Sequence, residues 1–426
     1  AYLNAYLATD DKFFLDAATE TALALVNGQL KSGGWSQTIH FGPAERLGDY
    51  RTRQGGKWNR SSLDDGQTQS ALRFLLEMDY ELSFKHAQIH DAARYGLDSL
   101  IAAQFANGAF PQVFAGPATP QPIAKAKYPN YDWKTEGRLK NYWDYYTLND
   151  GLAGTVSDLL IDASKLAENQ AQADKAEAAL RKLGDFLILA QMPDPQPGWC
   201  QQYNYAMEPI WARKFEPPAI TGSESQDVMR TLIKIATFTG DAKYLEPIPR
   251  AADYFEKHLL SDGQVARYYE LQTSKPLYMD KEYKLTYDDS NVPEHYGWKK
   301  SAKFDEIAKQ SKALTMRLGL GGLDIPRQWP AEFTPERYRH RSEFQNPFQT
   351  FSGIDAGDRQ GRVAKAGEAA KKVLAELDAQ GRWVSTYAGE SLTGQPKFAK
   401  GFKYISSEVF AKNLAVLGEY LWALEE

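Results

Sequence analysis

The stretch that decides the fold runs from Ser61 to Tyr80 and reads SSLDDGQTQSALRFLLEMDY. Its second half carries apolar residues three and four positions apart, the spacing that places them on one face of a helix. Its first half is acidic and hydroxylic, and such side chains suit a helix start, where they cap free backbone N–H groups and face the positive end of the dipole. The stretch therefore predicts a helix over Ser70–Tyr80 that follows an acidic turn.

The same helical period recurs along the chain, whereas few segments alternate as strands do. The predicted helices are Ser70–Tyr80, Ala87–Gln104, Gly151–Leu166, Ala176–Gln191, Ser225–Phe238 and Tyr244–Leu260. Loops with Gln, Asn or Asp near a Gly follow helix ends at Asn27–Gln37, Asn107–Gln112, Pro195–Tyr203, Ser261–Tyr269 and Ala379–Ser385. Their spacing is too irregular for a solenoid and fits helical hairpins that carry loop insertions.

Polar helix starts follow these loops and indicate how the helices are arranged. They are Ser61–Gln69, Thr147–Gly151, Thr221–Asp227 and Tyr404–Phe410. In an α/α toroid the inner helices run in one direction, so their N-termini meet on one face. We predict an all-α protein, an incomplete α/α toroid of helical hairpins whose long irregular loops form a cleft. Because no Gly/Ser or Pro-repeat linker is present, we expect one catalytic domain over residues 1–426, with a short N-terminal helix at about 1–27 and a less regular segment at about 285–361.

Composition excludes several classes of protein. With 50 basic and 55 acidic residues the net charge is −5, so the chain has no electrostatic footprint for nucleic acid or an anionic bilayer. No apolar run approaches the roughly 18 residues that span a membrane. The single Cys200 excludes an internal disulfide or a thiolate zinc cluster. The opening AYLNAYLATDD lacks Met and a leader pattern, so we expect a processed mature protein without its signal peptide.

Aromatic content points to a binding cleft. Trp, Tyr and Phe number 10, 24 and 20 and make up 13% of the chain, and many stand beside Gly, Pro, Asp or Arg in loops. Flat amphipathic rings in loops suit the faces of sugars. The alternative is that these rings pack between helices and cover loops. Their clustering favours the cleft.

Acidic residues gather at two of the helix starts. Asp64 and Asp65 open one helix, and Asp144 and Asp150 flank the start of another. A cluster of carboxylates is what a hard cation such as calcium needs, and equally what an acid–base pair needs. Taken singly, each Asp is explained by helix capping.

Cations stand in two unusual loops. Arg213 lies within Pro209–Ser225, where two prolines prevent a helix, and a loop arginine among aromatic neighbours commonly grips a carboxylate or phosphate. The alternative is a structural clamp between Arg213 and Glu216. Downstream, Arg267 and Lys275 stand among tyrosines, a setting that suits an anionic sugar polymer, although ordinary surface solvation also explains them.

These residues carry a resemblance to the family 10 polysaccharide lyases, which are pectate lyases of the pectic-acid-cleaving type. The matching strings, in the family's order, are GGWSQ (Gly33–Gln37), DDGQTQSALRFL (Asp64–Leu75), NGAFPQ (Asn107–Gln112), TLND (Thr147–Asp150), PGWCQQY (Pro197–Tyr203), ARKFEPPAITGSES (Ala212–Ser225), RYYEL (Arg267–Leu271) and TSKPLYM (Thr273–Met279). The resemblance implies an incomplete helical toroid, calcium dependence, cleavage of polygalacturonate by anti β-elimination with an arginine as base, and secretion.

The family's site residues carry over by position. The resemblance implies Arg213 as the base and Asp144 and Asp150 as ligands of calcium. The residues that we expect to bind substrate are Asp65, Arg267, Lys275, Arg230, Tyr269 and Trp199. The sequence departs from the family's pattern at Gly151, which replaces a second acidic residue, and at Lys275, which replaces the more usual Arg. It also carries what looks like a long insertion at Val113–Tyr142.

Elimination from a uronate requires removal of the proton beside the carboxylate, so neutralising that carboxylate is the central task. We expect calcium on Asp144 and Asp150, with Arg267 and Lys275, to supply the charge, and nearby cations to lower the pKa of Arg213 so that it acts as base. Arg230 is a second candidate base. The rival functions are an inverting glycoside hydrolase that uses two of Asp65, Asp144 and Asp150, and a non-catalytic uronate-binding protein. We expect a monomer whose partner is polygalacturonate.

Overall fold

The chain divides into two compact units. The structure is a computed structural model that describes residues 1–42, 48–53, 56–135, 139–294, 296–319, 359–389 and 398–425. The larger unit is Ala24–Trp329, and the smaller combines Ala1–Leu23 with Pro330–Glu426. One boundary between the units falls inside a helix, α2 (Lys12–Gly28). The single catalytic domain expected over residues 1–426 stays a prediction.

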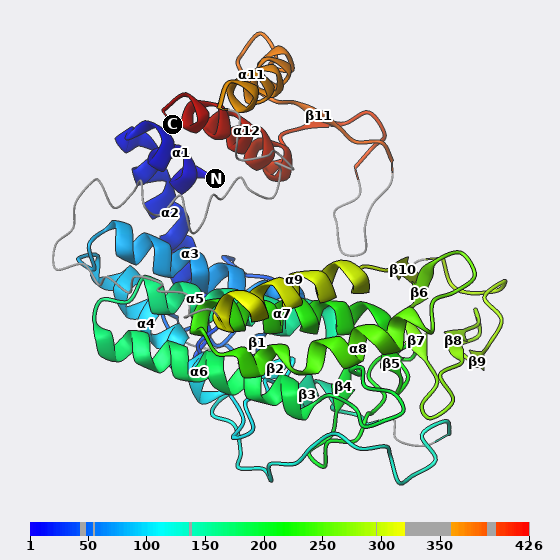
Figure 1. Ribbon diagram of the computed structural model, residues 1–426. Coiled ribbons are helices and arrows are strands. Elements are labelled where there is room, and N and C mark those ends of the chain that lie inside the picture. The colour runs from blue at the N-terminus through cyan, green and yellow to red at the C-terminus, as the bar shows by residue number, and fades with distance from the viewer. Residues whose placement is uncertain are drawn as a thin grey trace. The chain divides into compact units, whose positions relative to one another are not determined.

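The smaller unit joins the two ends of the sequence (Figure 1). Helix α12 (Ser407–Glu425) packs against α11 (Arg359–Ala375) and also against α1 (Tyr2–Thr9). The N-terminal helix expected at about 1–27 is in fact two helices, α1 and α2, because Asp10 adopts a left-handed conformation with φ 53° and ends the first. The polar start predicted at Tyr404–Phe410 is confirmed by α12.

The larger unit contains the six helices predicted from hydrophobic periodicity. They are α3 (Gln67–Glu81), α4 (Ala87–Ala102), α5 (Leu152–Lys165), α6 (Gln170–Leu189), α7 (Gly222–Thr239) and α8 (Pro247–Glu256). A further helix, α9 (Phe304–Gly319), lies in the segment at about 285–361 that we expected to be less regular. Residues 320–358 of that segment lie outside the described residues.

The helices of the larger unit form an α/α toroid (Figure 1). Helices α3, α5, α7 and α9 form one row in which each packs against the next, while α4, α6 and α8 pack as antiparallel partners of α3, α5 and α9. Because α3, α5 and α7 alternate with partners that return the chain, all three run in one direction. Their N-terminal ends therefore meet on one face, as the sequence predicted.

Glutamines at the helix ends explain the recurring loops. Gln29 donates from Nε2 to the carbonyl of Gly33 in its own loop at 2.9 Å and to Ala92 of α4 at 2.9 Å. Gln104 and Gln191 each make the same pair of bonds, one to their own loop and one to a carbonyl of the next partner helix or its start. One side chain thus closes each turn and ties it to the following hairpin.

Strands in the described residues are short and antiparallel. Their bounds are β1 (Ser61–Ser62), β2 (Val113–Phe114), β3 (Tyr146–Thr147), β4 (Gln202–Tyr203), β5 (Ile220–Thr221), β6 (Gln264–Ala266), β7 (Tyr268–Tyr269), β8 (Pro276–Met279), β9 (Leu285–Thr286), β10 (Lys299–Ser301), β11 (Ser385–Thr386) and β12 (Lys403–Tyr404). Strands β1 to β10 belong to the larger unit, and β11 and β12 to the smaller. The largest sheet has the order β5-β7-β8-β9. None of the described helices has the length and apolar character needed to cross a membrane.

Candidate active site

Two matching left-handed turns open the neighbouring helices α3 and α5. In the first, Asp65 and Gly66 have φ values of 47° and 70°, and in the second, Asp150 and Gly151 have φ values of 51° and 66°. A left-handed conformation costs a non-glycine residue about 1–2 kcal/mol, and such strain is typical of functional positions. Because α3 and α5 pack side by side, the two aspartates face each other.

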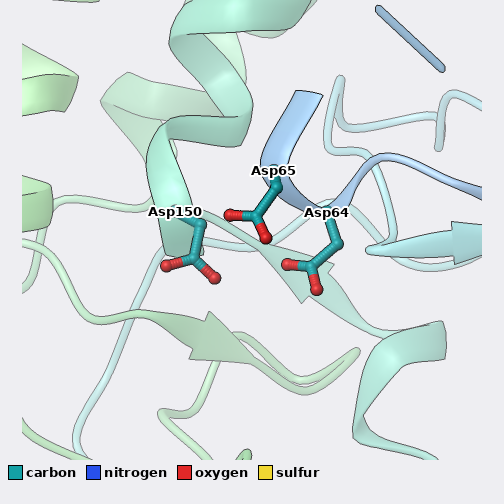
Figure 2. A group of neighbouring side chains, drawn as sticks. All are labelled: Asp64, Asp65 and Asp150. Atoms are coloured by element: carbon teal, nitrogen blue, oxygen red, sulfur yellow. The ribbon is translucent and has the colours of Figure 1, made fainter. Parts of the chain in front are cut away.

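Three carboxylates converge at these turns (Figure 2). Asp64, Asp65 and Asp150 each offer one oxygen atom, and these atoms all lie within 4.8 Å of one another. Burial raises the pKa of Asp150 to about 7; the Arg213 guanidinium opposes this shift, and the charges of Asp64 and Glu216 add to it. A cation bound among the three oxygens would relieve that repulsion. An all-carboxylate donor set also matches what calcium prefers, so the residues fit this metal.

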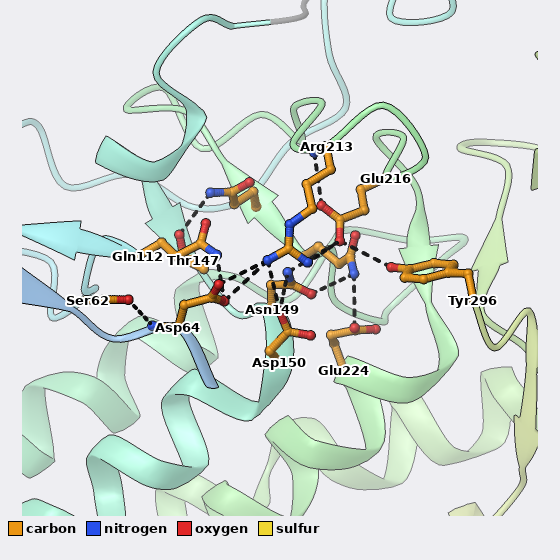
Figure 3. Close-up of polar contacts among 12 residues, drawn as sticks. Ser62, Asp64, Gln112, Thr147, Asn149, Asp150, Arg213, Glu216, Glu224 and Tyr296 are labelled. Carbon is orange, nitrogen blue, oxygen red and sulfur yellow. Dashed lines mark hydrogen bonds and ion pairs between the residues drawn. The ribbon is translucent and has the colours of Figure 1, made fainter. Parts of the chain in front are cut away.

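Arg213 reaches into the cluster from the loop before β5 (Figure 3). One amino group of its guanidinium lies 3.1 Å from Asp64 Oδ2 and 3.6 Å from Asp150 Oδ2. The other lies 3.5 Å from Glu216 Oε1. The structural clamp with Glu216 that the sequence left open is therefore present, but the same guanidinium also contacts two carboxylates of the cluster.

Glu216 contacts this guanidinium and fixes its position. Its side chain is only 1% exposed and accepts hydrogen bonds from the backbone N–H of Arg213 at 2.9 Å and from the Tyr296 hydroxyl at 3.2 Å. Asn149 Nδ2 donates both to Glu216, at 3.4 Å, and to Asp150, at 2.8 Å. Glu216 thus joins the turn before α5 to the loop that carries Arg213 (Figure 3).

The electrostatics of Arg213 differ from the sequence-based expectation. Burial works against its charge, but Glu216, Asp64 and Asp150 outweigh burial and raise the pKa of the guanidinium above its usual range. We expected neighbouring cations to lower that pKa. The described neighbours are three carboxylates and the Tyr142 hydroxyl, with no second cation among them, so Arg213 is held protonated in this state.

Arg267 lies deeper in the same network. It is 7% exposed, and its guanidinium contacts Glu224 Oε1 at 3.3 Å and sits 4.0 Å from the ring centroid of Tyr296. Gln201 Nε2 donates to both Glu224 and Asn149, which links Arg267 to the turn before α5. With so little exposure, contact between Arg267 and substrate stays a prediction.

Three other predicted residues lie outside the cluster. Asp144, expected as a calcium ligand, pairs with Arg60 at 2.5 Å and is not among the three converging carboxylates. Arg230, the second candidate base, is on an exposed face of α7, where its guanidinium lies 3.8 Å from Asp227. Lys275 is exposed before β8, with its ammonium 5.4 Å from the ring centroid of Tyr287.

Trp199 and Tyr269 require a correction. Both were expected to bind substrate, yet each is 0% exposed. Trp199 Nε1 donates to the carbonyl of Leu187 at 2.8 Å, and the Tyr269 hydroxyl donates to the carbonyl of His258 at 2.7 Å. Because protein encloses both rings and the polar atoms are satisfied internally, they pack in the core as the alternative interpretation of the aromatics described.

The residues that sequence analysis missed share a recognisable signal. Leu63–Gly66 reads LDDG and Leu148–Gly151 reads LNDG, and both form the same left-handed turn. Aligning the two strings places Asp64 opposite Asn149, and this equivalence identifies both as site residues. Glu216 had been noted only as the clamp partner of Arg213, because its contacts with Asn149 and Tyr296 join residues far apart in the sequence.

Comparisons with known proteins give a family and structures of similar fold. The profile of a family described as pectic acid lyase matches residues 29–265. The structure of a family 10 polysaccharide lyase from Cellvibrio cellulosa has 19% identity and a TM-score of 0.52, over 73% of this chain and 95% of that one. A mutant of that lyase in complex with trigalacturonic acid also has 19% identity and a TM-score of 0.52, over 74% of this chain and 98% of that one. Curated protein sequences contain no match.

Proposed function

This chain belongs to the pectic acid lyase family, and we propose that it cleaves polygalacturonate by calcium-assisted β-elimination at the cluster of Asp64, Asp65, Asp150 and Arg213. The observation that carries the proposal is the convergence of three carboxylates and one arginine on the face where the inner helices begin. The solved complex of a structurally similar lyase with trigalacturonic acid supports a uronate substrate.

Calcium would be held by Asp64, Asp65 and Asp150 rather than by Asp144. When bound, it supplies positive charge that neutralises a uronate carboxylate and so acidifies the neighbouring carbon. The raised pKa of Asp150 means that this carboxyl must lose its proton before it can serve as a ligand, so metal affinity rises with pH.

Arg213 is the proposed base because its guanidinium lies within the cluster, whereas Arg230 pairs with Asp227 on another face. Its neutral form would take the proton from the carbon that bears the carboxylate. The electrons of that C–H bond form the double bond, the glycosidic C–O bond breaks, and the departing oxygen takes a proton from water. Glu216 keeps the guanidinium in place through the backbone bond and the ion pair described above.

The raised pKa of Arg213 sets a condition on this step. Glu216, Asp64 and Asp150 hold the guanidinium protonated in the structure, so its proton is lost more easily when Asp64 and Asp150 are engaged elsewhere. Their use as metal ligands would remove that part of the stabilisation, while Glu216 stays paired with Arg213. Proton abstraction and metal binding are therefore expected to depend on the same pair of side chains.

An inverting hydrolase is less compatible with the geometry. Its two carboxyl groups stand about 6.5–9.5 Å apart to leave room for water. Asp65 and Asp150 instead converge with Asp64 so that one oxygen atom of each lies within 4.8 Å of the others, which suits a shared cation, and Asp144 is paired with Arg60. We also propose that the protein is secreted, because the polymer that it degrades is too large to enter a cell. We expect it to be a monomer.

The deciding experiment is the ultraviolet absorbance of unsaturated products during incubation with polygalacturonate, with and without a chelator. Absorbance should rise, stop after chelation, and resume when calcium is restored. Reducing ends without absorbance would indicate a hydrolase, and binding without either product would indicate a non-catalytic uronate-binding protein.

A further inference from the structure

A cavity lies next to the loop that carries Arg213. It has a volume of about 230 Å³ and is lined by three aromatic residues, one lysine and polar loop residues. Its lining is Tyr128, Pro129, Tyr131, Asp132, Trp133, Lys134, Leu271 and Gln272. Most of these belong to the Val113–Tyr142 insertion, which the active-site cluster does not use. Pockets for drug-sized ligands measure about 300–1,000 Å³, so this one suits a single sugar ring.

The insertion is fastened to the Arg213 loop by two hydrogen bonds. The Tyr131 hydroxyl donates to the carbonyl of Pro209 at 2.7 Å, and Trp211 Nε1 donates to the carbonyl of Trp133 at 2.7 Å. Trp211 and Arg213 are two residues apart, so their Cα atoms are separated by at most about 7 Å. The cavity is therefore close enough to the cluster for one polymer chain to reach both.

The cavity offers aromatic rings and one ammonium to an anionic sugar, and the carboxylate of Asp132 in its lining is occupied by the backbone N–H of Lys134 and the Thr135 hydroxyl. The hydroxyls of Tyr128 and Tyr131 are committed to backbone carbonyls, which leaves the rings as its apolar surface. The Lys134 ammonium is half-exposed at 50%, lies 5.6 Å from the Trp133 ring centroid, and uses its donors on Glu270 Oε1 at 2.5 Å and on the Tyr287 side chain. An ammonium has three donors, so one is left for a carboxylate.

We propose that this cavity is a distal subsite that binds one galacturonate unit of the polymer, with its ring against Trp133 and Tyr131 and its carboxylate on Lys134. The subsite rests on the proposed function for its choice of polymer. Glu270 does not compete for the bound unit, because its carboxylate already accepts hydrogen bonds from Thr273 and from Tyr287 in addition to Lys134.

The test is a binding series with oligogalacturonates of increasing length on the Arg213→Ala background, in which no turnover is expected. Affinity should rise at the length that reaches the cavity. Trp133→Ala and Lys134→Met should each remove that rise, by about tenfold, because a charge-assisted contact or a stacked ring is lost. Oligomers of neutral glucose should show no rise at all.

A matched control separates the subsite from general charge. Lys127 is in the same insertion, is 53% exposed, and pairs with the buried Glu208 at 3.2 Å, just as Lys134 pairs with Glu270. Lys127→Met should leave the length dependence unchanged. Tyr131→Phe keeps the ring but removes the bond to Pro209, so it reports on the position of the loop alone.

Two outcomes of the binding series would overturn the subsite. A rise that survives in both Trp133→Ala and Lys134→Met overturns the subsite. Equal losses at every length would show that the insertion only positions the Arg213 loop, and also overturn it. The proposed function fails separately, if the unsubstituted protein forms no unsaturated product, because the binding series requires no turnover.

Discussion

Replacing Asp150 by Asn isolates the charge at the centre of the carboxylate cluster. The amide has the same shape and keeps an oxygen that can accept the bond from Asn149. At an effective dielectric constant of 20, a repulsion at 4.8 Å is worth about 3.5 kcal/mol and an attraction at 3.6 Å about 4.6 kcal/mol. Asp64 contributes the full repulsion, exposed Asp65 about half of it after solvent screening, and Arg213 the attraction.

The repulsions thus exceed the attraction by about 0.6 kcal/mol, and burial of the Asp150 carboxylate adds to this. We expect Asp150→Asn to stabilise the calcium-free protein by about 1 kcal/mol at pH 8. The folded-state pKa of about 7 lies above the unfolded value of 3.8, so the folded protein binds more protons. Stability contributed by this carboxyl is present below about pH 4 and is lost as pH rises through 7, so the gain should be smaller at pH 5 than at pH 8 and vanish only below about pH 4.

The assay is urea unfolding at pH 5 and pH 8, with chelator and with calcium. Calcium should stabilise the unsubstituted protein more at pH 8 than at pH 5, and should stabilise Asp150→Asn little at either pH. Asp144→Asn is the control, because its ion pair with Arg60 lies outside the cluster, and it should keep the response to calcium. A full calcium response in Asp150→Asn, or a loss of stability at pH 8, would show that the cluster is not the metal site.

Three further predictions concern the reaction and the turns. Arg213→Lys should abolish formation of unsaturated product while polygalacturonate still binds; activity like that of the unsubstituted protein would transfer the role of base to Arg230. Polygalacturonate should be cleaved much faster than highly methyl-esterified pectin, since esterification removes the charge that cations bind, and equal initial rates would rule out charge neutralisation. Gly151→Ala, with φ 66° and no close neighbour, should cost about 1 kcal/mol in urea unfolding through backbone strain alone. Gly154→Ala, inside α5, should cost nothing or stabilise the protein, and equal effects would contradict this reason.

The helices and the face of the site could be predicted from the sequence. Apolar spacing located α3 to α8, and the polar starts showed that distant N-termini meet, because both signals are local and each helix carries its own. The resemblance of short motifs to pectic acid lyases implied Arg213 and Asp150 as base and metal ligand; these side chains lie 3.6 Å apart, and their roles stay predictions. Helix α9 was missed, because its segment was expected to be less regular.

What only the tertiary structure decided is which side chains converge. Asp144 and Asp150 are six residues apart, yet Asp144 pairs with Arg60, while Asp64 from another helix completes the cluster. Likewise, nothing local distinguishes the buried ring of Trp199 from the half-buried ring of Trp133. Sequence spacing sets the direction of a side chain on its own element, whereas the distance between two carboxylates on different helices depends on how those helices pack, and that distance determines which group binds a metal and which pKa rises.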